Sequence, residues 1–221
     1  LVLTAEYSDL WKEDKKTETN EVMFALQHSA KHKIASNYGK SYYPSDYSPN
    51  AGWADYYGNE DFFKAYPNDD RKEWNYMTEW KIKSGEIIPY TESADKYYDY
   101  DEGAPGKSAQ SNGITCIYRY AEVLLMYAEA STRATNTVNQ DALNAIQEVQ
   151  KRAGYQDRQI ELTTTTEPTA FLAAVSNERG WEFFAEMKRW FELVRLEKVK
   201  EVRAEEWDAS TFNTNHHYYF P

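Results

Sequence analysis

Hydrophobic positions recur at three- and four-residue steps in the segment that follows Gly113. In residues 116–133 they are Ile117, Ala121, Leu124, Leu125 and Ala128. Residues 137–154 repeat the spacing with Ala142, Ala145, Ile146, Val149 and Ala153. Because this spacing puts the apolar side chains on one face of an α-helix, each segment is predicted to form one amphipathic helix.

The second of these helices carries capping signals at both ends. Asn139 or Asp141 can accept hydrogen bonds from the free N–H groups at its start, and Gly154 can end it. Together the two helices predict a hairpin about as long as one tetratricopeptide-type repeat, with alanines where the helices approach closely. One such pair cannot bury its own apolar face, so other segments must pack against it.

A third helix is predicted from Pro168, a good first-turn residue, through about Lys198. Its apolar positions form one stripe that is expected to face the core: Leu172, Val175, Phe183, Met187, Trp190, Phe191 and Val194. Charged residues flank that stripe, namely Glu178, Glu182, Glu186, Arg179, Arg189 and Arg195. With the i,i+3 pair Arg119 and Glu122, they predict half-buried arginine–carboxylate links between packed helices.

The pattern is different before Gly113, where Gly, Pro, Asn, Asp and Ser recur every few residues from Asn37 onward. These residues favour turns, so the stretch is predicted to be rich in loops, with short strands such as residues 74–82. Residues 21–30 could form either a short buried strand or a helix turn. We therefore divide the chain into a loop-rich region, 1–113, and a helical region, 114–221, within one structural domain.

Composition excludes several classes of protein. The chain has 36 acidic and 25 basic residues and a net charge of -11, so it would repel a nucleic-acid backbone. Its single cysteine, Cys116, lies in an apolar stretch and is predicted to be buried. No segment approaches the ~20 apolar residues of a membrane span. The chain does not begin with Met and ends on "NHHYYFP", so we expect a fragment of a longer protein.

Known catalytic and metal-binding patterns are weak in this sequence. The acidic groups that could act as paired carboxylates have no specific spacing; they are Glu178, Glu182 and Glu186, Asp69 and Asp70, and Asp99 and Asp101. His28 and His32 lie four apart without a metalloprotease glutamate between them, and His216 and His217 are adjacent. "DYDEG" at 99–103 lacks the later glutamate of a calcium loop. We predict no catalytic residue, no metal and no cofactor.

Aromatic residues are the unusual component, at 16% of the chain. Seven rings fall within twenty residues, amid Asn and Asp: Tyr38, Tyr42, Tyr43, Tyr47, Trp53, Tyr56 and Tyr57. Flat rings beside amides and carboxylates suit a sugar, whose C–H face stacks on a ring while its hydroxyls form hydrogen bonds. The alternative is that large rings fill a region poor in regular structure.

Three helical blocks resemble the C-terminal half of the SusD/RagB family of Bacteroidetes outer-membrane nutrient-binding lipoproteins. They are "IYRYAEVLLMYAEAS", "DALNAIQEVQKRAG" and "FLAAVSNERGWEFFAEMKRWFELVRLEK", in the family's order, over about residues 114–198. Upstream, "NEVMFALQHS" and "DFFKAYPNDDRK" are similar to two weaker landmarks of the family, and "HHYYFP" to the start of its terminal stretch.

The resemblance implies a mainly α, SusD-like fold, with a tetratricopeptide-type helix pair, a long helix and an irregular, loop-rich region with short strands that holds the ligand. It also implies a protein that is not an enzyme. Such a protein lies on the cell surface of the outer membrane as a lipoprotein, touching the membrane only through an N-terminal lipid anchor absent from this chain. It delivers a glycan or other nutrient to a SusC-like TonB-dependent transporter.

Within that family the signature helices are scaffold, and this carries over to Arg179, Glu182, Glu186, Arg189 and Trp190. The family places ligand contacts between the two upstream landmarks. Composition, together with this placement of ligand contacts in the family, gives six candidate ligand-binding residues: Tyr42, Tyr43, Tyr47, Trp53, Tyr56 and Tyr57. Two alternatives stay open: a helical interaction protein that binds a transporter or a non-carbohydrate nutrient, and, less favoured, a glycoside hydrolase.

Overall fold

The computed structural model describes residues 1–46, 52–97 and 111–202. The chain divides into two compact units, Leu1–Glu182 and Phe183–Pro221. The described residues of the first unit form two short 3-10 helices, two antiparallel two-stranded sheets and five α-helices. In chain order its elements are η1 (Tyr7–Leu10), β1 (Val22–Gln27), η2 (Gly39–Ser41), α1 (Glu60–Ala65), α2 (Asp70–Asn75), β2 (Tyr76–Lys81), β3 (Ile87–Ala94), β4 (Ile114–Arg119), α3 (Tyr120–Thr135), α4 (Gln140–Arg152) and α5 (Pro168–Glu182).

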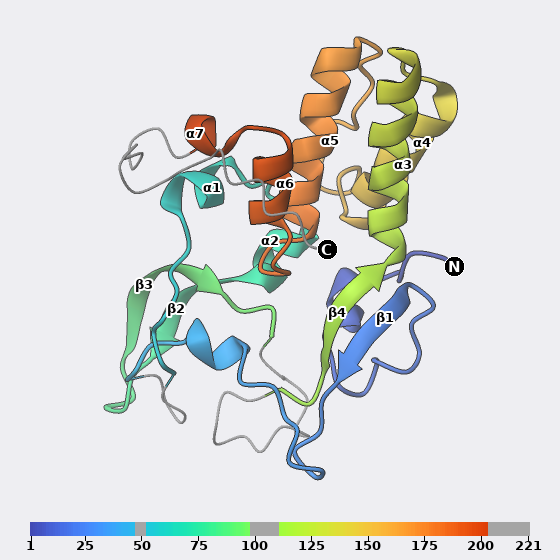
Figure 1. The fold of residues 1–221 in the computed structure, drawn as a ribbon. Helices are drawn as coiled ribbons and strands as arrows, with labels where there is room; N and C mark the ends of the chain where they lie inside the picture. Colours follow the sequence, from blue (N-terminus) through green and yellow to red (C-terminus); the bar gives the residue numbers. More distant parts are fainter. Residues whose placement is uncertain (47–51, 98–110, 203–221) are drawn as a thin grey trace. The chain divides into compact units, whose positions relative to one another are not determined.

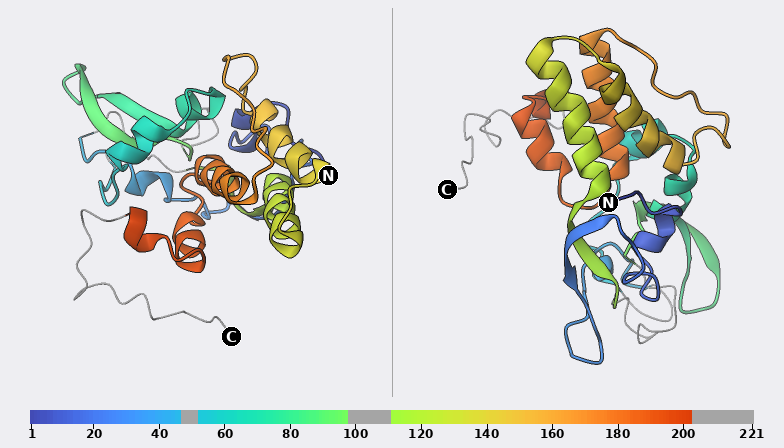
Figure 2. Two further views of the ribbon diagram at one scale, coloured as in Figure 1. Left: turned by 90° about the horizontal axis from the view of Figure 1, so that it is seen from above. Right: turned by 90° about the vertical axis from the view of Figure 1, so that its right-hand side faces the viewer.

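The predicted helical hairpin is confirmed as α3 and α4, which lie side by side and pack with α5 (Figures 1 and 2). The predicted start of the first helix is wrong, because residues 116–119, including Ile117, belong to the strand β4 and α3 begins at Tyr120. The side chain of Asn139 accepts a hydrogen bond from the Ala142 backbone N–H, so this asparagine is the N-cap of α4. Gly154 has a positive φ of 82° just after the helix, as expected of a terminating glycine. The predicted inner face is buried at Ala121, Leu125, Ala128, Ala142, Ala145, Ile146, Val149 and Ala153.

The prediction of one helix from Pro168 through Lys198 is wrong, because α5 ends at Glu182. Side chains from distant segments satisfy its last carbonyls. Arg119 donates to the Glu182 carbonyl at 2.7 Å, and the Tyr66 hydroxyl donates to that of Trp181 at 2.6 Å. Long-range donors therefore replace the hydrogen bonds that continued helix would make.

The second unit contains α6 (Arg189–Arg195) and α7 (Val199–Val202). Ala185 and Met187, which precede α6, have φ values near +60°, a conformation that no α-helix contains. The prediction of a single core-facing stripe is therefore also wrong, because Phe183 is buried but Met187, Trp190 and Phe191 are exposed.

The described residues form two separate two-stranded sheets, β1–β4 and β2–β3, and β4 lies in the region 114–221 that was predicted to be helical. Of residues 21–30, Val22–Gln27 form the strand β1 rather than a helix turn, and Phe24 pairs with Tyr118 of β4. Three apolar side chains of β1, those of Met23, Phe24 and Leu26, are exposed, so the strand is not a buried one. The strand expected around 74–82 is confirmed as β2, although its first two residues belong to α2.

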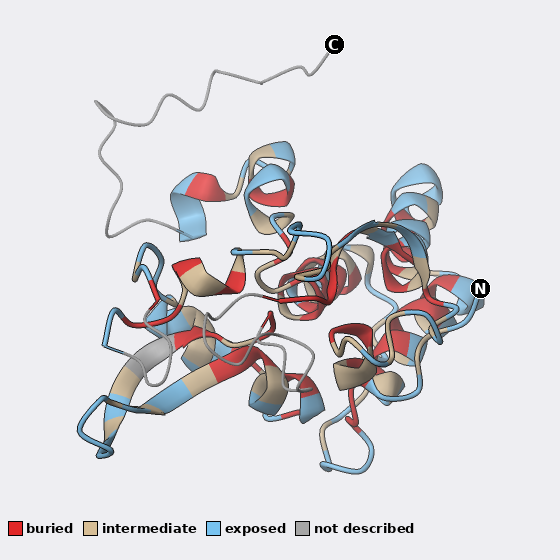
Figure 3. Cartoon of the chain, turned by 90° about the horizontal axis from the view of Figure 1, so that it is seen from below, coloured by how far each residue is buried: buried red, intermediate tan, exposed pale blue. Residues whose placement is uncertain are grey.

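Buried residues concentrate where the helices meet, whereas the turn of the β2–β3 hairpin is exposed (Figure 3). Cys116 is buried, as predicted. Among the described residues, no helix is both long and apolar enough to cross a bilayer.

Candidate functional site

An extended loop carries three of the predicted site residues and is held to the chain around η2. The backbone N–H of Trp53 donates to the Lys40 carbonyl at 2.9 Å, and the N–H of Tyr56 donates to that of Ser41 at 3.1 Å. Between them, Ala54 has a positive φ of 53°, which sharply redirects the chain. The loop is thus fixed by backbone hydrogen bonds and does not depend on side-chain packing alone.

The close approach of this loop requires glycine at position 52. A Cβ atom there would overlap the backbone carbonyl of Tyr43. The N–H of Gly52 donates to the carbonyl of Pro44 at 2.8 Å, and the N–H of Ala54 donates to that of Tyr43 at 3.0 Å. Gly52 therefore sets where Trp53 and the rings after it are held.

Three of the six predicted ligand-binding side chains are strongly exposed. Trp53 is 52%, Tyr56 55% and Tyr57 59% exposed. Tyr42 is half-buried beneath Tyr56, with their ring centroids 5.6 Å apart. Rings that are rigidly held yet open to solvent can stack on the apolar face of a ligand. We call Tyr42, Trp53 and Tyr56 the loop rings.

The loop rings rest on further aromatic side chains. The Tyr38 ring meets Tyr42 edge-on at 5.5 Å, and the two hydroxyls lie 3.0 Å apart. Tyr38 in turn packs edge-on against Tyr97 at 4.7 Å. On the other side of the loop, the Lys40 ammonium lies 5.4 Å from the centroid of the Trp53 ring. Tyr38 and Tyr97 thus extend the aromatic packing from Tyr42 inward.

Two predicted residues do not join this surface. Tyr43 is 1% exposed, and its hydroxyl donates a hydrogen bond to the carboxyl group of Asp95. Its assignment as a ligand contact is corrected: in this structure it anchors the loop from inside. Tyr47 lies outside the described residues.

The carboxyl group of Asp95 is unusual because it is buried. Burial raises its pKa to about 6, although the hydrogen bond from Tyr43 acts in the opposite direction. A carboxyl group whose pKa is higher in the folded than in the unfolded state favours folding while protonated. Its contribution to stability is therefore fully present below the unfolded pKa of about 4 and is lost as the pH rises through about 6.

We expect Asp95→Asn to be more stable than the natural protein at pH 8, by up to about 3 kcal/mol in the free energy of unfolding. An asparagine can still accept the Tyr43 hydrogen bond but has no charge to desolvate. Urea denaturation at pH 4, 6 and 8 checks this, with Asp157→Asn as an exposed control. A difference between Asp95→Asn and the natural protein that does not grow with pH would contradict it.

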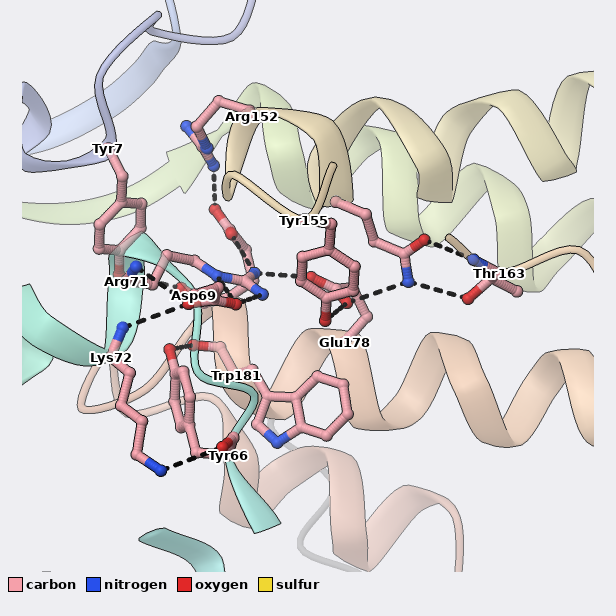
Figure 4. Close-up of polar contacts among 12 residues, drawn as sticks. Tyr7, Tyr66, Asp69, Arg71, Lys72, Arg152, Tyr155, Thr163, Glu178 and Trp181 are labelled. Atoms are coloured by element: carbon pink, nitrogen blue, oxygen red, sulfur yellow. Dashed lines mark hydrogen bonds and ion pairs between the residues drawn. The ribbon is translucent and has the colours of Figure 1, made fainter. Parts of the chain in front are cut away.

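A second polar arrangement lies inside the first unit and links four of its elements. Three arginines and four carboxylates, all nearly or fully buried, form what we call the arginine–carboxylate cluster: Arg71, Arg119, Arg152, Glu21, Asp69, Glu178 and Glu182. Arg71 contacts Asp69 and Glu178 at 2.6 Å each and Glu182 at 2.7 Å (Figure 4). The Glu21 carboxylate lies 2.9 Å from the Arg119 guanidinium and 2.8 Å from that of Arg152.

The pKa values in the cluster follow from burial and these partners. Burial alone would raise the pKa of Glu182, but the guanidinium groups of Arg152, Arg119 and Arg71 outweigh it and hold that pKa well below its usual range. For Glu178 and Asp69, burial outweighs the effect of Arg71 and raises their pKa values. The cluster is thus a charged core that joins distant segments.

The cluster confirms the expectation of arginine–carboxylate links but not its details. Glu178 and Glu182 bind arginines, yet they are fully buried and not half-buried. Arg119 contacts Glu21 and Glu182, and Glu122 lies 3.7 Å from Arg179. Sequence reasoning missed Arg71, Arg152 and Glu21 as members, and the Asp-x-Arg spacing of Asp69 and Arg71 was the only signal.

Most candidate catalytic carboxylates are unsuited to flank a substrate. Asp69, Glu178 and Glu182 are inaccessible and ion-paired, and exposed Asp70 binds Arg158 at 2.8 Å. Asp99 and Asp101 lie outside the described residues, as do His216 and His217. Both ring nitrogens of His28 are engaged, one with the Ile34 carbonyl and one with the Thr115 hydroxyl. Within the described ranges, no three His, Cys, Asp or Glu side chains gather as metal ligands would.

Comparison with known proteins identifies the scaffold. The model of the SusD family matches residues 93–220, more than half of the chain. The chain belongs to the SusD family. The matched range begins in β3 and covers β4, α3, α4 and α5, so it includes Glu178 and Glu182 of the cluster. The loop rings lie before it.

One curated relative and several solved structures are similar to this chain in sequence or in fold. "SusD-like protein P2" of Formosa agariphila is 28% identical over 160 residues, which are 63% of this chain and 31% of that protein. A SusD homologue from Bacteroides thetaiotaomicron has a TM-score of 0.78 and 19% identity, covering 99% of this chain and 52% of that one. Surface glycan-binding protein A from the same organism, solved with laminarihexaose, has a TM-score of 0.69 and 23% identity over 90% of this chain and 47% of that one. This chain therefore spans 31–52% of the length of these relatives.

Proposed function

We propose that this SusD-family chain binds a glycan through the loop rings, without chemical conversion. The observation that carries the proposal is the set of solvent-exposed rings, Trp53 and Tyr56, fixed on a backbone-anchored loop. Stacked rings bind the C–H face of a sugar, and nearby polar groups accept or donate hydrogen bonds to its hydroxyls. A structural relative of the same fold was solved with a hexasaccharide, which supports a carbohydrate ligand.

The proposal extends to the cellular role that the family resemblance implies. The chain would act at the cell surface as part of an outer-membrane lipoprotein and deliver its glycan to a SusC-like TonB-dependent transporter. The acidic net charge of -11 favours a neutral or cationic glycan over a sulfated or uronic one. The division into a ligand-binding region, 1–113, and a scaffold region, 114–221, belongs to the same proposal.

A screen by affinity gel electrophoresis, with neutral and anionic polysaccharides in the gel, tests this function. We expect a neutral polysaccharide to retard the protein and Trp53→Ala to weaken retardation about tenfold, because one stacked ring contributes ~1 kcal/mol or somewhat more. Trp190→Ala is the matched control, since Trp190 is 48% exposed but lies outside the loop. Unchanged melting of both variants shows that folding is intact. Retardation by none of the polysaccharides, or only by polyanionic ones, would contradict the proposal.

A second candidate function, binding of a protein partner through the helical part, is favoured by one observation. Val123, Met126 and Tyr127 lie at i, i+3 and i+4 on α3 and are exposed, and the exposed side chain of Tyr118 comes just before this helix. Such a face is typical of a surface that contacts another protein. If this is the function, no polysaccharide will retard the protein in the gel. Met126→Glu will then weaken capture of the protein by a transporter partner.

A further inference from the structure

A small cavity of about 220 Å³ lies where η1, α2 and the end of α4 meet. The η1 side contributes Glu6 and Ser8, α2 contributes Asp70, Glu73 and Trp74, and α4 contributes Arg152. The volume corresponds to about seven water molecules at ~30 Å³ each, which is below the usual size of a pocket for drug-sized ligands. A ligand of this cavity is therefore a small molecule, no larger than about one sugar unit.

Three carboxylates border the cavity and face few positive charges. Asp70 and Glu73 share one partner, Arg158, whose guanidinium lies 2.8 Å from the first and 2.7 Å from the second. Glu6 is exposed, and among the described residues its side chain forms no ion pair. Three carboxylates with one guanidinium leave a net charge of -2 at the border of the cavity.

The positive charge of Arg152 does not offset this excess, because it is already used inside the protein. The two terminal nitrogens of Arg152 bind Glu21, at 2.8 Å, and Glu182. The arginine–carboxylate cluster to which they belong has one carboxylate more than it has arginines. The electrostatic potential in the cavity is therefore negative, which favours a cationic ligand.

Arg152 also has a donor that the protein does not use. Its side chain is only 4% exposed, and within the described ranges its Nε–H forms no hydrogen bond although the atom is shielded from water. Its guanidinium carbon lies 5.3 Å from the centroid of the Tyr7 ring, and both residues line the cavity. Buried N–H groups nearly always have an acceptor in protein, water or ligand. A ligand in the cavity can supply that acceptor.

Trp74 gives the cavity a flat aromatic wall. The Lys12 ammonium lies 5.6 Å from the centroid of this ring, a distance at which a cation is attracted to the face of an indole. Lys12 is itself paired with Asp9 at 3.0 Å, so its charge does not reverse the negative potential. The ring therefore favours a ligand with a positive charge over one with a negative charge.

We propose that this cavity binds a small hydroxylated ammonium compound, and that an amino sugar with a free amine is the class of ligand that fits. The ammonium group lies among the carboxylates of Glu6, Asp70 and Glu73, and a ligand hydroxyl accepts the Nε–H of Arg152. A neutral sugar lacks the charge, and a simple ammonium ion lacks the acceptor. The site is separate from the loop rings and does not depend on the glycan proposed for them.

Calorimetric titration of the intact chain at pH 6 and low salt tests this proposal with three probes: glucosamine, glucose and methylammonium chloride. We expect glucosamine to bind at least tenfold more tightly than either of the others, because it alone offers both the charge and the acceptor. Its affinity should fall as the salt concentration rises, since the carboxylates that attract it are exposed.

Three variants locate the bound glucosamine. Glu6→Gln removes one carboxylate charge without breaking an ion pair, and we expect it to weaken glucosamine binding about fivefold. Glu161→Gln is the matched control, because Glu161 is also exposed but does not line the cavity. Trp53→Ala should leave the affinity for glucosamine unchanged, which separates this site from the loop rings.

Arg152→Lys tests the unused donor. Lysine keeps a positive charge for Glu21 and Glu182 but has no Nε–H, so we expect glucosamine binding to weaken severalfold. Because Arg152 belongs to the arginine–carboxylate cluster, thermal melting of this variant is measured first, and Glu6→Gln decides alone if the variant does not fold. The proposal is overturned if glucosamine does not bind, if it binds no more tightly than glucose, if Glu6→Gln leaves its affinity unchanged, or if Trp53→Ala abolishes its binding.

Discussion

Replacing Arg71 by methionine is expected to lower the free energy of unfolding by about 3–5 kcal/mol. The side chain is fully buried and binds three carboxylates, those of Asp69, Glu178 and Glu182, at 2.6–2.7 Å. Methionine can fill much of the volume but leaves Asp69 and Glu178 without their cation. An unpaired buried carboxylate is far less favourable than a paired one, because no solvent replaces the lost partner.

Urea denaturation at pH 7, followed by circular dichroism, measures this loss. The free energy of unfolding of Arg71→Lys should lie between those of Arg71→Met and the natural protein. Lysine keeps the positive charge but lacks the planar guanidinium group that binds three carboxylates at once. Arg158→Met is the control for losing an arginine whose ion pairs are at the surface, and it should move the midpoint little. A loss in Arg71→Met no larger than that of the control would show that the cluster does not stabilise the fold.

The same variant should respond to pH in a defined direction. The pKa values of Glu178 and Asp69 are already raised by burial, and removing Arg71 takes away the group that lowers them. A carboxyl group whose pKa is higher in the folded than in the unfolded state makes the folded protein less stable as the pH rises. The difference in stability between Arg71→Met and the natural protein should therefore be larger at pH 8 than at pH 5.

Local signals account for the parts of the fold that were predicted correctly. α3 and α4 follow from one-sided periodicity, and the start of α4 follows from its asparagine cap, because both depend on neighbours within a few residues. The end of α5 could not be predicted in that way. It is set by donors from Tyr66 and Arg119, which are distant in sequence, and no local pattern between Pro168 and Lys198 signals them.

The difference between local and long-range causes also decides which part of the candidate site could be predicted. Composition and the family resemblance indicated an aromatic loop, and the structure exposes Trp53, Tyr56 and Tyr57 there. Sequence reasoning could not distinguish Tyr43, whose side chain turns inward to Asp95, from its neighbour Tyr42. Sequence reasoning also missed that Tyr57 lies near Tyr90 of β3, because only the fold brings these two residues together.

Gly52→Ala is expected to abolish most glycan binding while leaving the helical part folded. The added Cβ would overlap the Tyr43 carbonyl, which is backbone and cannot move aside as a flexible side chain would. The loop must then leave its place on η2 and lose the hydrogen bonds that hold Trp53 and Tyr56. Losing two stacked rings at ~1.4 kcal/mol each corresponds to an affinity about 100-fold weaker.

Affinity gels with the retarding polysaccharide measure the loss, and near-ultraviolet circular dichroism reports the displaced rings without any ligand. The control is Gly154→Ala, because a Cβ at that position would also clash, here with the side chain of Asp70, in a residue whose φ is positive. It should lower the melting temperature yet leave retardation intact at temperatures where the variant is folded. If Gly52→Ala retains full retardation, the rings do not need the anchored loop. The geometry of η2 would then be irrelevant to binding, and contact with the ligand would have to come from rings held elsewhere.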